Sequence, residues 1–538
     1  MMQIELWRAG ILAFEVTRDY ENPFLDLSVM AVFTAPSGRT IHREAYWDGG
    51  RSYKVSFAPT ELGVWSYCLA APEDSGLNGI QGEVEGIPYT GTLDIYKHGF
   101  LKVSESKQHI CYDDGTPFFW LGDTHWGFIA GEKWNESNYE KTDSMFRYMA
   151  DKRVAQKFTV YQTNLRSETW NQMPGARPAT THFWADGHLG TLPDVTFYQQ
   201  EVDIRMQYLA DIGLVNALGF AWGGSVVDRV ELQKNLARYM VARYGALPMV
   251  WTLAGESAGY APSTRQACID GWREVALVVQ EMDGYGQLQT THYNNERPYC
   301  DYYFDEDWYD FTLNQAGHGD RPINADWIIE HRTKHPGKPF VEAESMYEYC
   351  STLEPNGMRL CTAEMMRRVA YLNMQHGAAG YTYGAQGIWD TVWEKPETPN
   401  PFNRFNKFGI AWYEAIEAPG ADQLTLMREF YERYDWTTLV PSNTLLRRGE
   451  QFEDLLLSGS DVHVLASEDR RLVLAYFPES VFMPTAMYKL NVGCYRVQWF
   501  DPRTGDYTEV GDITIEDGTW RGLTRPGAGD WMLVLTQK

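Results

Sequence analysis

Residues 213–256, GLVNALGFAWGGSVVDRVELQKNLARYMVARYGALPMVWTLAGE, read as one strand–helix–strand unit. The apolar runs at 213–224 and 249–256 are short enough for buried strands. Between them, residues 229–245 carry apolar side chains at i, i+3, i+4 and i+7, which is the spacing of an amphipathic helix. The helical pattern ends at Gly245, and glycine is common just after a helix. This stretch therefore predicts a strand, a crossover helix and a second strand.

The same alternation repeats on both sides of this unit. Six more short apolar runs are FFWLGDTHW (118–126), KFTVYQTN (157–164), LQTTHYN (288–294), FTLNQAG (311–317), PFVEAES (339–345) and AAGYTYGAQG (378–387). Helical patterns separate most of them, at 136–154, 197–213, 263–284 and 362–377. Eight strand–helix units predict an α/β fold, a (β/α)₈ TIM barrel with insertions. The alternative is a doubly wound open sheet, which usually has a glycine-rich phosphate loop after its first strand, and GDTHW is not one.

Residues on either side of the barrel pattern read as β structure. Short alternating runs such as LSVMAVFTAP and SYKVSFAP, divided by turn residues, predict an N-terminal antiparallel β-sandwich over residues 1–97. The runs RLVLAYF and GDWMLVL, with turns at DPRTG and PGAGD, predict a second sandwich over residues 437–538. The catalytic barrel is then expected to occupy residues 98–436.

Composition narrows the class of protein and its partners. The chain has 538 residues, with 47 Lys and Arg against 72 Asp and Glu, which gives a formal charge of −25. So acidic a surface repels phosphate backbones and anionic lipid heads, which argues against nucleic-acid and membrane partners. The N-terminus lacks the basic and apolar segments of a signal peptide, and no apolar run is long enough to span a bilayer. We therefore expect a cytoplasmic location.

Neither the cysteines nor the histidines suggest a metal site. The seven cysteines are an odd number, are scattered and include no CxxC pair, which favours reduced thiols. His125, His292 and His318 lie on different predicted strands, with no HxH or HExxH spacing. We therefore expect no metal and no cofactor.

Carboxylates at two strand ends indicate hydrolytic chemistry. In TIM barrels, function lies at the C-terminal ends of the strands. Glu256 ends the fourth predicted strand, and Glu342 and Glu344 share one face of the seventh because strand side chains alternate. Glycoside hydrolysis needs such a pair across the barrel mouth. Glu256 and Glu344 are the candidate catalytic residues, with Glu348, in the following loop, as the rival on this strand.

Polar and aromatic residues at the remaining strand ends are candidates for binding sugar hydroxyls and stacking on sugar faces. These candidate substrate-binding residues are Asp123, His125, Trp126, Asn164, Trp222, His292, Gln315, His318, Tyr383, Gln386 and Trp389. Each tryptophan has ordinary packing as its alternative reading, and Asp123 could instead cap the segment that follows it.

Several of these runs resemble the apiosidase-like glycoside hydrolases. DDGTPFFWLGDTHW (113–126) looks like the opening strand of that family, and WTLAGE (251–256) resembles its strand-four motif, usually Gly-Gly-Asp. KPFVEAESMYE (338–348) resembles its strand-seven pattern, and GAAGYTYGAQGIW (377–389) its last strand and loop. The flanking segments are similar to the β-sandwich that often precedes this barrel and to a collagen-binding-type sandwich that follows it. Together the similar stretches cover nearly the whole chain.

The resemblance implies a retaining barrel of the clan-A type, with Glu256 as acid/base and Glu344 as nucleophile. One departure is that the family usually has Asp at the position of Glu256. The longer side chain moves the carboxyl group by about one C–C bond, roughly 1.5 Å, which favours a substrate other than apiose.

The sequence thus predicts an exo-acting glycosidase that removes a terminal furanoside or deoxysugar from plant or microbial glycans or glycosides. Two alternatives stay open: a non-catalytic carbohydrate-binding protein, and a lyase or transglycosidase on the same barrel. The sugar, its anomer and its linkage are not readable from the sequence, and association into homo-oligomers also stays open.

Overall fold

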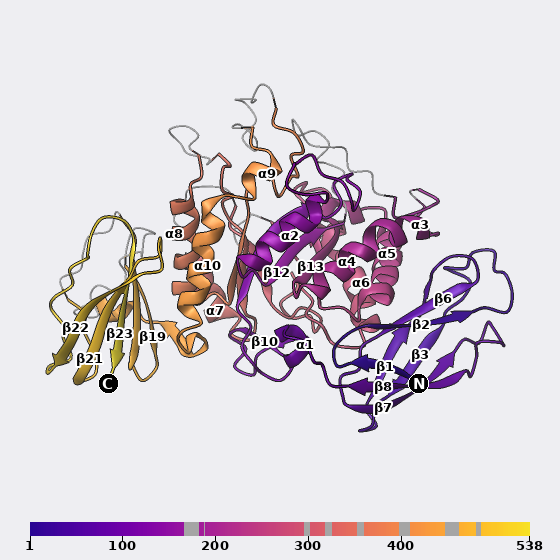
Figure 1. The fold of residues 1–538 in the computed structure, drawn as a ribbon, viewed down its shortest axis with the longest axis horizontal. Helices are drawn as coiled ribbons and strands as arrows, with labels where there is room; N and C mark the ends of the chain where they lie inside the picture. The colour runs from indigo at the N-terminus through magenta and orange to yellow at the C-terminus, as the bar shows by residue number, and fades with distance from the viewer. Residues whose placement is uncertain are drawn as a thin grey trace.

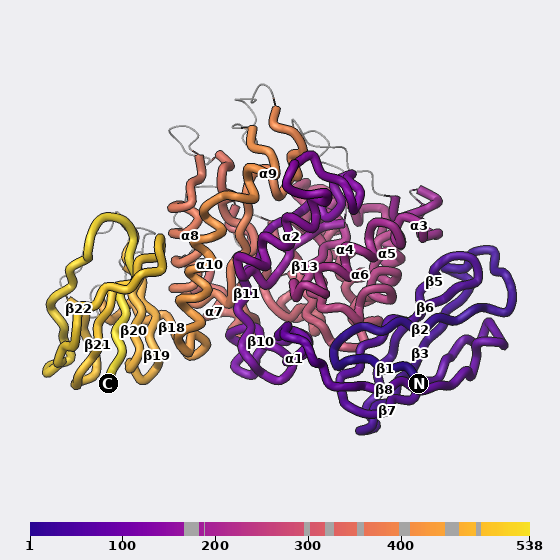
Figure 2. Tube along the Cα trace, viewed as in Figure 1, coloured from indigo at the N-terminus to yellow at the C-terminus, as the bar shows by residue number. Residues whose placement is uncertain are grey.

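The molecule has three parts in a row along its long axis (Figure 1). The computed structural model describes residues 1–165, 182–187, 189–294, 302–317, 325–351, 360–396, 409–446, 462–479 and 486–538. A β domain at the N-terminus and a β-sheet at the C-terminus lie at opposite ends of a central strand–helix body, as the Cα trace in Figure 2 shows.

The central body is built on a parallel sheet of seven hydrogen-bonded strands, in the order β14-β13-β12-β11-β17-β16-β15. Their bounds are β11 Trp120–Gly127, β12 Val160–Asn164, β13 Val215–Trp222, β14 Met249–Gly255, β15 Thr312–Gln315, β16 Phe340–Glu344 and β17 Gly380–Tyr383. These strands coincide with seven of the eight predicted apolar runs.

The eighth predicted run, residues 288–294, closes the gap between β14 and β15 without forming a regular strand. On one side, the Thr290 N–H donates to the Trp251 carbonyl at 2.8 Å. On the other side, the Tyr293 N–H donates to the Leu313 carbonyl at 3.2 Å. Isolated parallel bridges join the run to both neighbouring strands. The eight segments thus form a closed barrel, which confirms the predicted α/β barrel class.

Helices cover the outside of the barrel (Figure 1). The longer ones are α2 Met145–Ala155, α4 Asp203–Asp211, α5 Val230–Tyr244, α6 Arg265–Met282, α7 Ala325–Lys334, α8 Ala363–Gln375 and α10 Pro419–Tyr431. Shorter elements are α1 Asp94–His98, α3 Val195–Phe197, α9 Trp412–Ala415 and the hairpin of β9 Leu101–Val103 with β10 Ile110–Tyr112. Helix α2 begins at Met145 and not at the predicted residue 136, because Ser144 caps it: the Ser144 hydroxyl accepts the Arg147 N–H.

The N-terminal domain packs two sheets face to face. Their orders are β1-β8-β7-β3-β4 and β2-β6-β5, antiparallel except for the pair β1–β8. The strands are β1 Met2–Glu5, β2 Gly10–Glu15, β3 Met30–Thr34, β4 Thr40–Glu44, β5 Tyr46–Trp47, β6 Ser52–Phe57, β7 Gly63–Ala70 and β8 Gln81–Ile87. Arg43, on β4 of this domain, is fully buried. Its guanidinium group donates hydrogen bonds to the carbonyls of Val241 and Ala242 near the end of α5, which ties the domain to the barrel.

The C-terminal sheet is antiparallel, in the order β18-β19-β20-β23-β21-β22. Its strands are β18 Leu439–Pro441, β19 His463–Ser467, β20 Leu472–Phe477, β21 Gly493–Phe500, β22 Tyr507–Ile515 and β23 Trp531–Gln537. Along β20, Leu474 and Tyr476 join the core of the barrel helices, whereas Val473 and Ala475 join the core of the C-terminal domain itself. Burial of both faces explains why this strand reads as a continuous apolar run and does not alternate.

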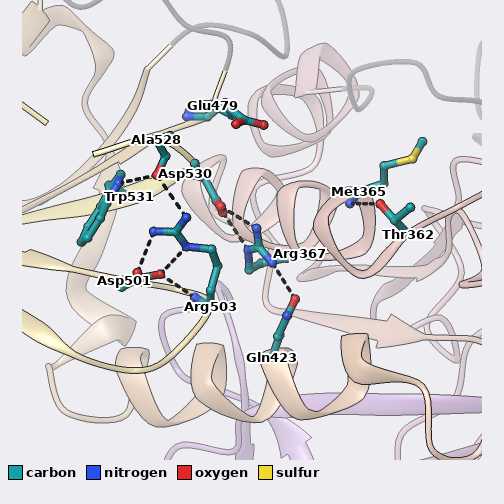
Figure 3. A network of polar contacts seen from close by, with 12 residues as sticks. Thr362, Met365, Arg367, Gln423, Glu479, Asp501, Arg503, Ala528, Asp530 and Trp531 are labelled. Carbon is teal, nitrogen blue, oxygen red and sulfur yellow. Dashed lines mark hydrogen bonds and ion pairs between the residues drawn. The ribbon is translucent and has the colours of Figure 1, made fainter. Parts of the chain in front are cut away.

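A buried ion pair links this sheet to the barrel. Arg367 of α8 contacts Asp530 at the start of β23, and Gln423 of α10 accepts a further hydrogen bond from the same guanidinium group (Figure 3). The sheet is therefore held against the helix layer by polar contacts as well as by apolar packing.

The predicted domain boundaries, residues 97 and 437, lie before the first barrel strand and after helix α10. Residue 97 lies within α1, and residue 437 lies two residues before β18.

Among the described residues, no helix has the length and apolar character required to cross a membrane.

Candidate active site

Glu256 follows β14 directly, at the C-terminal mouth of the barrel. Its backbone has a φ of +50°, and the register shifts of the β13–β14 ladder lie earlier, between Leu218 and Ala221. Two glycines, Gly223 and Gly255, allow the strand ends to approach one another closely at this turn. A Cβ on Gly223 would lie 2.0 Å from the Glu256 carbonyl oxygen, and one on Gly255 would lie 2.5 Å from the Trp222 ring.

The Glu256 carboxylate is half-buried and accepts two hydrogen bonds on the same oxygen. The hydroxyl of Tyr260 donates to Oε1 at 2.6 Å, and the side-chain amide of Gln315 donates to it at 3.3 Å. Tyr260 is 53% exposed, so this end of the site faces solvent.

Glu344 ends β16 and is buried, with 4% of its surface exposed. Its Oε2 lies 3.4 Å from Nε2 of His292. The hydroxyl of Tyr347 donates a hydrogen bond to the same carboxylate. The same hydroxyl accepts a hydrogen bond of 3.0 Å from Nε1 of Trp126. Burial, and after it the charge of Glu344, raises the pKa of Tyr347 well above its ordinary value, so this phenol stays protonated as a donor.

Gln315 brings the two carboxylates into one site. A register shift after Asn314 places Gln315 opposite Glu344 in the β15–β16 ladder, while its side chain donates to Glu256. His292 makes a second link, because its carbonyl accepts the N–H of Ser257, next to Glu256. The acids predicted on the fourth and seventh strands thus share neighbours at one barrel mouth.

Aromatic rings pack on the two residues that contact Glu344, His292 and Tyr347. Trp126 meets Trp222 edge-on at 5.5 Å and His292 at 5.0 Å between ring centroids. Trp389 stacks on Tyr347 at 5.6 Å. The structure therefore gathers five of the predicted binding residues, Trp126, Trp222, His292, Gln315 and Trp389, around the two acids.

Asp123, His125 and Tyr383 lie elsewhere, between the barrel wall and its helices. Asp123 is fully buried and contacts Arg153 of α2 at 2.5 Å and Nε2 of His125 at 2.7 Å. Burial alone would raise the pKa of Asp123. The positive charge and hydrogen bonds of Arg153 and His125 outweigh that effect and hold the pKa of Asp123 below its ordinary value. The other ring nitrogen of His125 contacts the hydroxyl of Tyr161 at 2.9 Å.

Tyr383 faces the same layer, since its hydroxyl donates to Glu348 at 2.6 Å and its ring packs on the Arg153 guanidinium group. The internal partners of these three residues give them a role in joining strands to helices.

Asn164 and Gln386 are buried and held by their own neighbours. The amide of Asn164 donates to the Ala221 carbonyl at 3.0 Å. The amide of Gln386 donates to Asp390 at 2.6 Å, and its oxygen accepts from the Trp389 indole at 3.3 Å. His318 lies outside the described residues.

The other two acids of the seventh strand region have internal partners as well. Glu342 accepts hydrogen bonds from Asn314 at 2.6 Å and from the Ala316 N–H at 3.0 Å, and burial raises its pKa to about 7. Glu348 accepts from Tyr383 and from the Gly420 N–H at the start of α10. Of the three acids, Glu344 is the one that contacts His292 and Tyr347.

Two residues of this site, Tyr260 and Tyr347, were not among the predicted site residues. Tyr347 follows Glu344 by three residues in AESMYE, and Tyr260 follows Glu256 by four in GESAGY. Such a short spacing, in which a turn folds a phenol back onto a strand-end acid, is the signal that would have found both. No three His, Cys, Asp or Glu side chains group as a metal site within the ranges that the structure describes.

Residues 104–438 match the family described as "Apiosidase-like, catalytic domain". The chain belongs to this apiosidase-like family. Residues 3–71 match a domain of unknown function, DUF5060, and residues 455–536 match a domain described as "Putative collagen-binding domain of a collagenase". The predicted resemblance is confirmed, and it places the chain among the glycoside hydrolases.

Solved structures share the fold of this chain. The structure of "a putative glycoside hydrolase from Bacteroides vulgatus" is similar over 100% of both chains, with a TM-score of 0.75 and 17% identity. A family 5 glycoside hydrolase from the same organism is similar over 83% of this chain and 95% of its own, with a TM-score of 0.65 and 19% identity. At these identities the likeness concerns the fold. No curated protein sequence matches the chain.

Proposed function

We propose that this protein is a retaining, exo-acting glycoside hydrolase in which Glu344 is the nucleophile and Glu256 the general acid and base. The observation that supports this most is the contrast between the two acids. Glu344 is buried among hydrogen-bond donors, whereas Glu256 is half-buried at the solvent edge, and Gln315 lies between them. A nucleophile needs a fixed, ionised carboxylate, and an acid/base must exchange protons with water.

The proposed reaction has two displacements at the anomeric carbon. In the first, a Glu344 oxygen bonds to that carbon while the glycosidic C–O bond breaks and Glu256 gives its proton to the leaving oxygen. In the second, Glu256 takes a proton from water, the water oxygen bonds to the anomeric carbon, and the ester to Glu344 breaks. The configuration of the sugar is retained, and Glu256 ends in its starting state.

In the proposed reaction, Tyr347 and His292 orient the carboxylate of Glu344. The chain of hydrogen bonds from the Trp126 indole through the Tyr347 hydroxyl fixes one side of the Glu344 carboxylate. As the ester forms, the charge leaves the carboxylate, and these fixed groups direct the attacking oxygen toward the sugar.

We propose a terminal sugar of small size, a furanoside or a deoxysugar, as the group that is released. The support is the set of aromatic side chains beside the two acids: Trp126 and Trp389 are buried against Trp222 and Tyr347 respectively, and Trp222, which is partly exposed, offers an apolar face for a sugar. The glutamate at position 256 favours a sugar other than apiose.

The test is a panel of 4-nitrophenyl glycosides covering pyranosides, furanosides and deoxysugars, with the first-formed anomer identified by NMR. We expect turnover of at least one member with retained configuration, and loss of that turnover by at least about a thousandfold in Glu344→Gln. Glu417→Gln, which changes an exposed helix-layer acid, is the matched control and should keep full activity.

Binding without turnover anywhere on the panel would instead favour the non-catalytic alternative. An unsaturated product would favour a lyase, and release only with an added acceptor would favour a transglycosidase.

A further inference from the structure

We propose that Tyr260 is a positioning residue for the proton of Glu256, an inference that rests on the proposed function. The hydroxyl of Tyr260 directs the acid proton to Oε2 of Glu256 and holds that carboxyl group in one orientation toward the leaving oxygen.

The hydrogen bonds on Oε1 carry this assignment. A carboxyl oxygen has two lone pairs for accepting hydrogen bonds. On Glu256, Oε1 accepts one from Tyr260 at 2.6 Å and one from Gln315 at 3.3 Å. The Gln315 amide nitrogen can only donate, and a proton on Oε1 would also force the Tyr260 hydroxyl to turn from donor to acceptor, so the protonated acid carries its proton on Oε2. Tyr260 and Gln315 together thus choose which oxygen delivers it.

The turn that carries Tyr260 is fixed, although the ring is exposed. The Gly259 N–H donates to the Glu256 carbonyl at 2.8 Å, which closes the turn. The buried side chain of Asn294 accepts from the Ala258 N–H at 3.1 Å and donates to the Gly259 carbonyl at 3.0 Å. The phenol therefore projects from backbone that is hydrogen-bonded to Asn294, at the end of the barrel segment 288–294.

Glu256 needs such a partner because its own side chain is long. A glutamate has one more torsion than an aspartate, so its carboxyl group can occupy several positions at the solvent edge of a site. A hydrogen bond from a fixed phenol selects one of them before substrate arrives, and positioning of this kind lowers the barrier to proton transfer.

The test compares Tyr260→Phe with wild type on three aryl glycosides of one sugar, the one that wild type hydrolyses fastest. The leaving groups are 2,4-dinitrophenol, 4-nitrophenol and phenol, which depend increasingly on protonation. Because the variant keeps the ring and loses only the hydroxyl, we expect kcat/KM to fall about tenfold for the phenyl glycoside and less than about twofold for the dinitrophenyl glycoside.

Tyr148→Phe is the matched control, since the hydroxyl of Tyr148 donates to Glu417 at 3.0 Å in the outer helix layer. It should leave all three rates unchanged. An equal loss on every leaving group in Tyr260→Phe, or no loss on any, would overturn the inference while leaving the proposed function in place. Inactivity of wild type on every glycoside would overturn the proposed function and this inference together.

Discussion

Arg367 and Asp530 form a buried ion pair with two parallel contacts of 2.6 and 2.9 Å, and both side chains are 4% exposed (Figure 3). The hydroxyl of Tyr476 donates to the same carboxylate at 2.8 Å. Because Arg367 lies on α8 and Asp530 precedes β23, the pair joins the C-terminal sheet to the barrel's helix layer. The sheet is thus built into the catalytic body.

Removing one member of this pair should destabilise the protein strongly. In Arg367→Ala, Asp530 loses its cation but stays buried, which typically costs about 3–5 kcal/mol. Urea unfolding followed by tryptophan fluorescence measures the change. The control is Arg496→Ala, whose pair with Glu509 has both members about half exposed and should be worth less than about 1 kcal/mol. Equal effects of the two substitutions would contradict a structural role for the buried pair.

Gly255→Ala should disturb the mouth of the barrel, because its Cβ would lie 2.5 Å from the indole of Trp222. We expect a loss of about 1–3 kcal/mol in unfolding free energy from overpacking. We also expect kcat/KM to fall about tenfold, since both Trp222 and the Glu256 turn must shift.

Gly224→Ala is the matched control for this substitution, because a Cβ there would meet nothing within 4 Å. It should be tolerated in both measurements. Normal activity of Gly255→Ala would mean that the indole position does not matter to catalysis.

Stability should depend on pH through Glu342. Burial raises the pKa of this acid from 4.5 to about 7, so the folded state keeps its proton over a range in which the unfolded state releases it. The stabilisation is complete below about pH 4.5 and is lost as the pH rises to about 7, a contribution on the order of 3 kcal/mol.

Unfolding of wild type and Glu342→Gln at pH 5 and pH 8 measures this term. The wild type should lose more stability between the two values than the variant does, because glutamine does not ionise. Glu231→Gln, at a side chain that is 78% exposed, should behave as wild type. The same pH dependence in all three proteins would show that Glu342 does not titrate as described.

The barrel could be predicted because its strands are buried on both sides and read as short apolar runs. The run at 288–294 was also found, although it closes the barrel through isolated bridges and irregular hydrogen bonds. Helix α10 was not predicted. Its residues, Pro419–Tyr431, pack partly against the C-terminal sheet, and a face shared between two domains blurs the one-sided apolar pattern.

The site was predictable in part. Glu256 and Glu344 could be named because a strand end in a barrel fixes where a side chain lies along the axis. The direction that a residue faces was harder to infer. Asp123 points outward to Arg153, a partner 30 residues away, and its side of the strand depends on register. The bulge that aligns Gln315 with Glu344 is likewise set by neighbouring strands and leaves no mark in the sequence.

The assignment of the two acids is tested most directly by azide rescue of Glu256→Ala. With a 2,4-dinitrophenyl glycoside, whose leaving group needs no proton, the glycosyl–Glu344 ester should still form and then accumulate. Azide fits the space left by the missing carboxyl group and attacks that ester, so the product should be a glycosyl azide with the configuration of the substrate. A glycosyl azide of inverted configuration would show that position 256 supplies the nucleophile and would contradict the proposed roles.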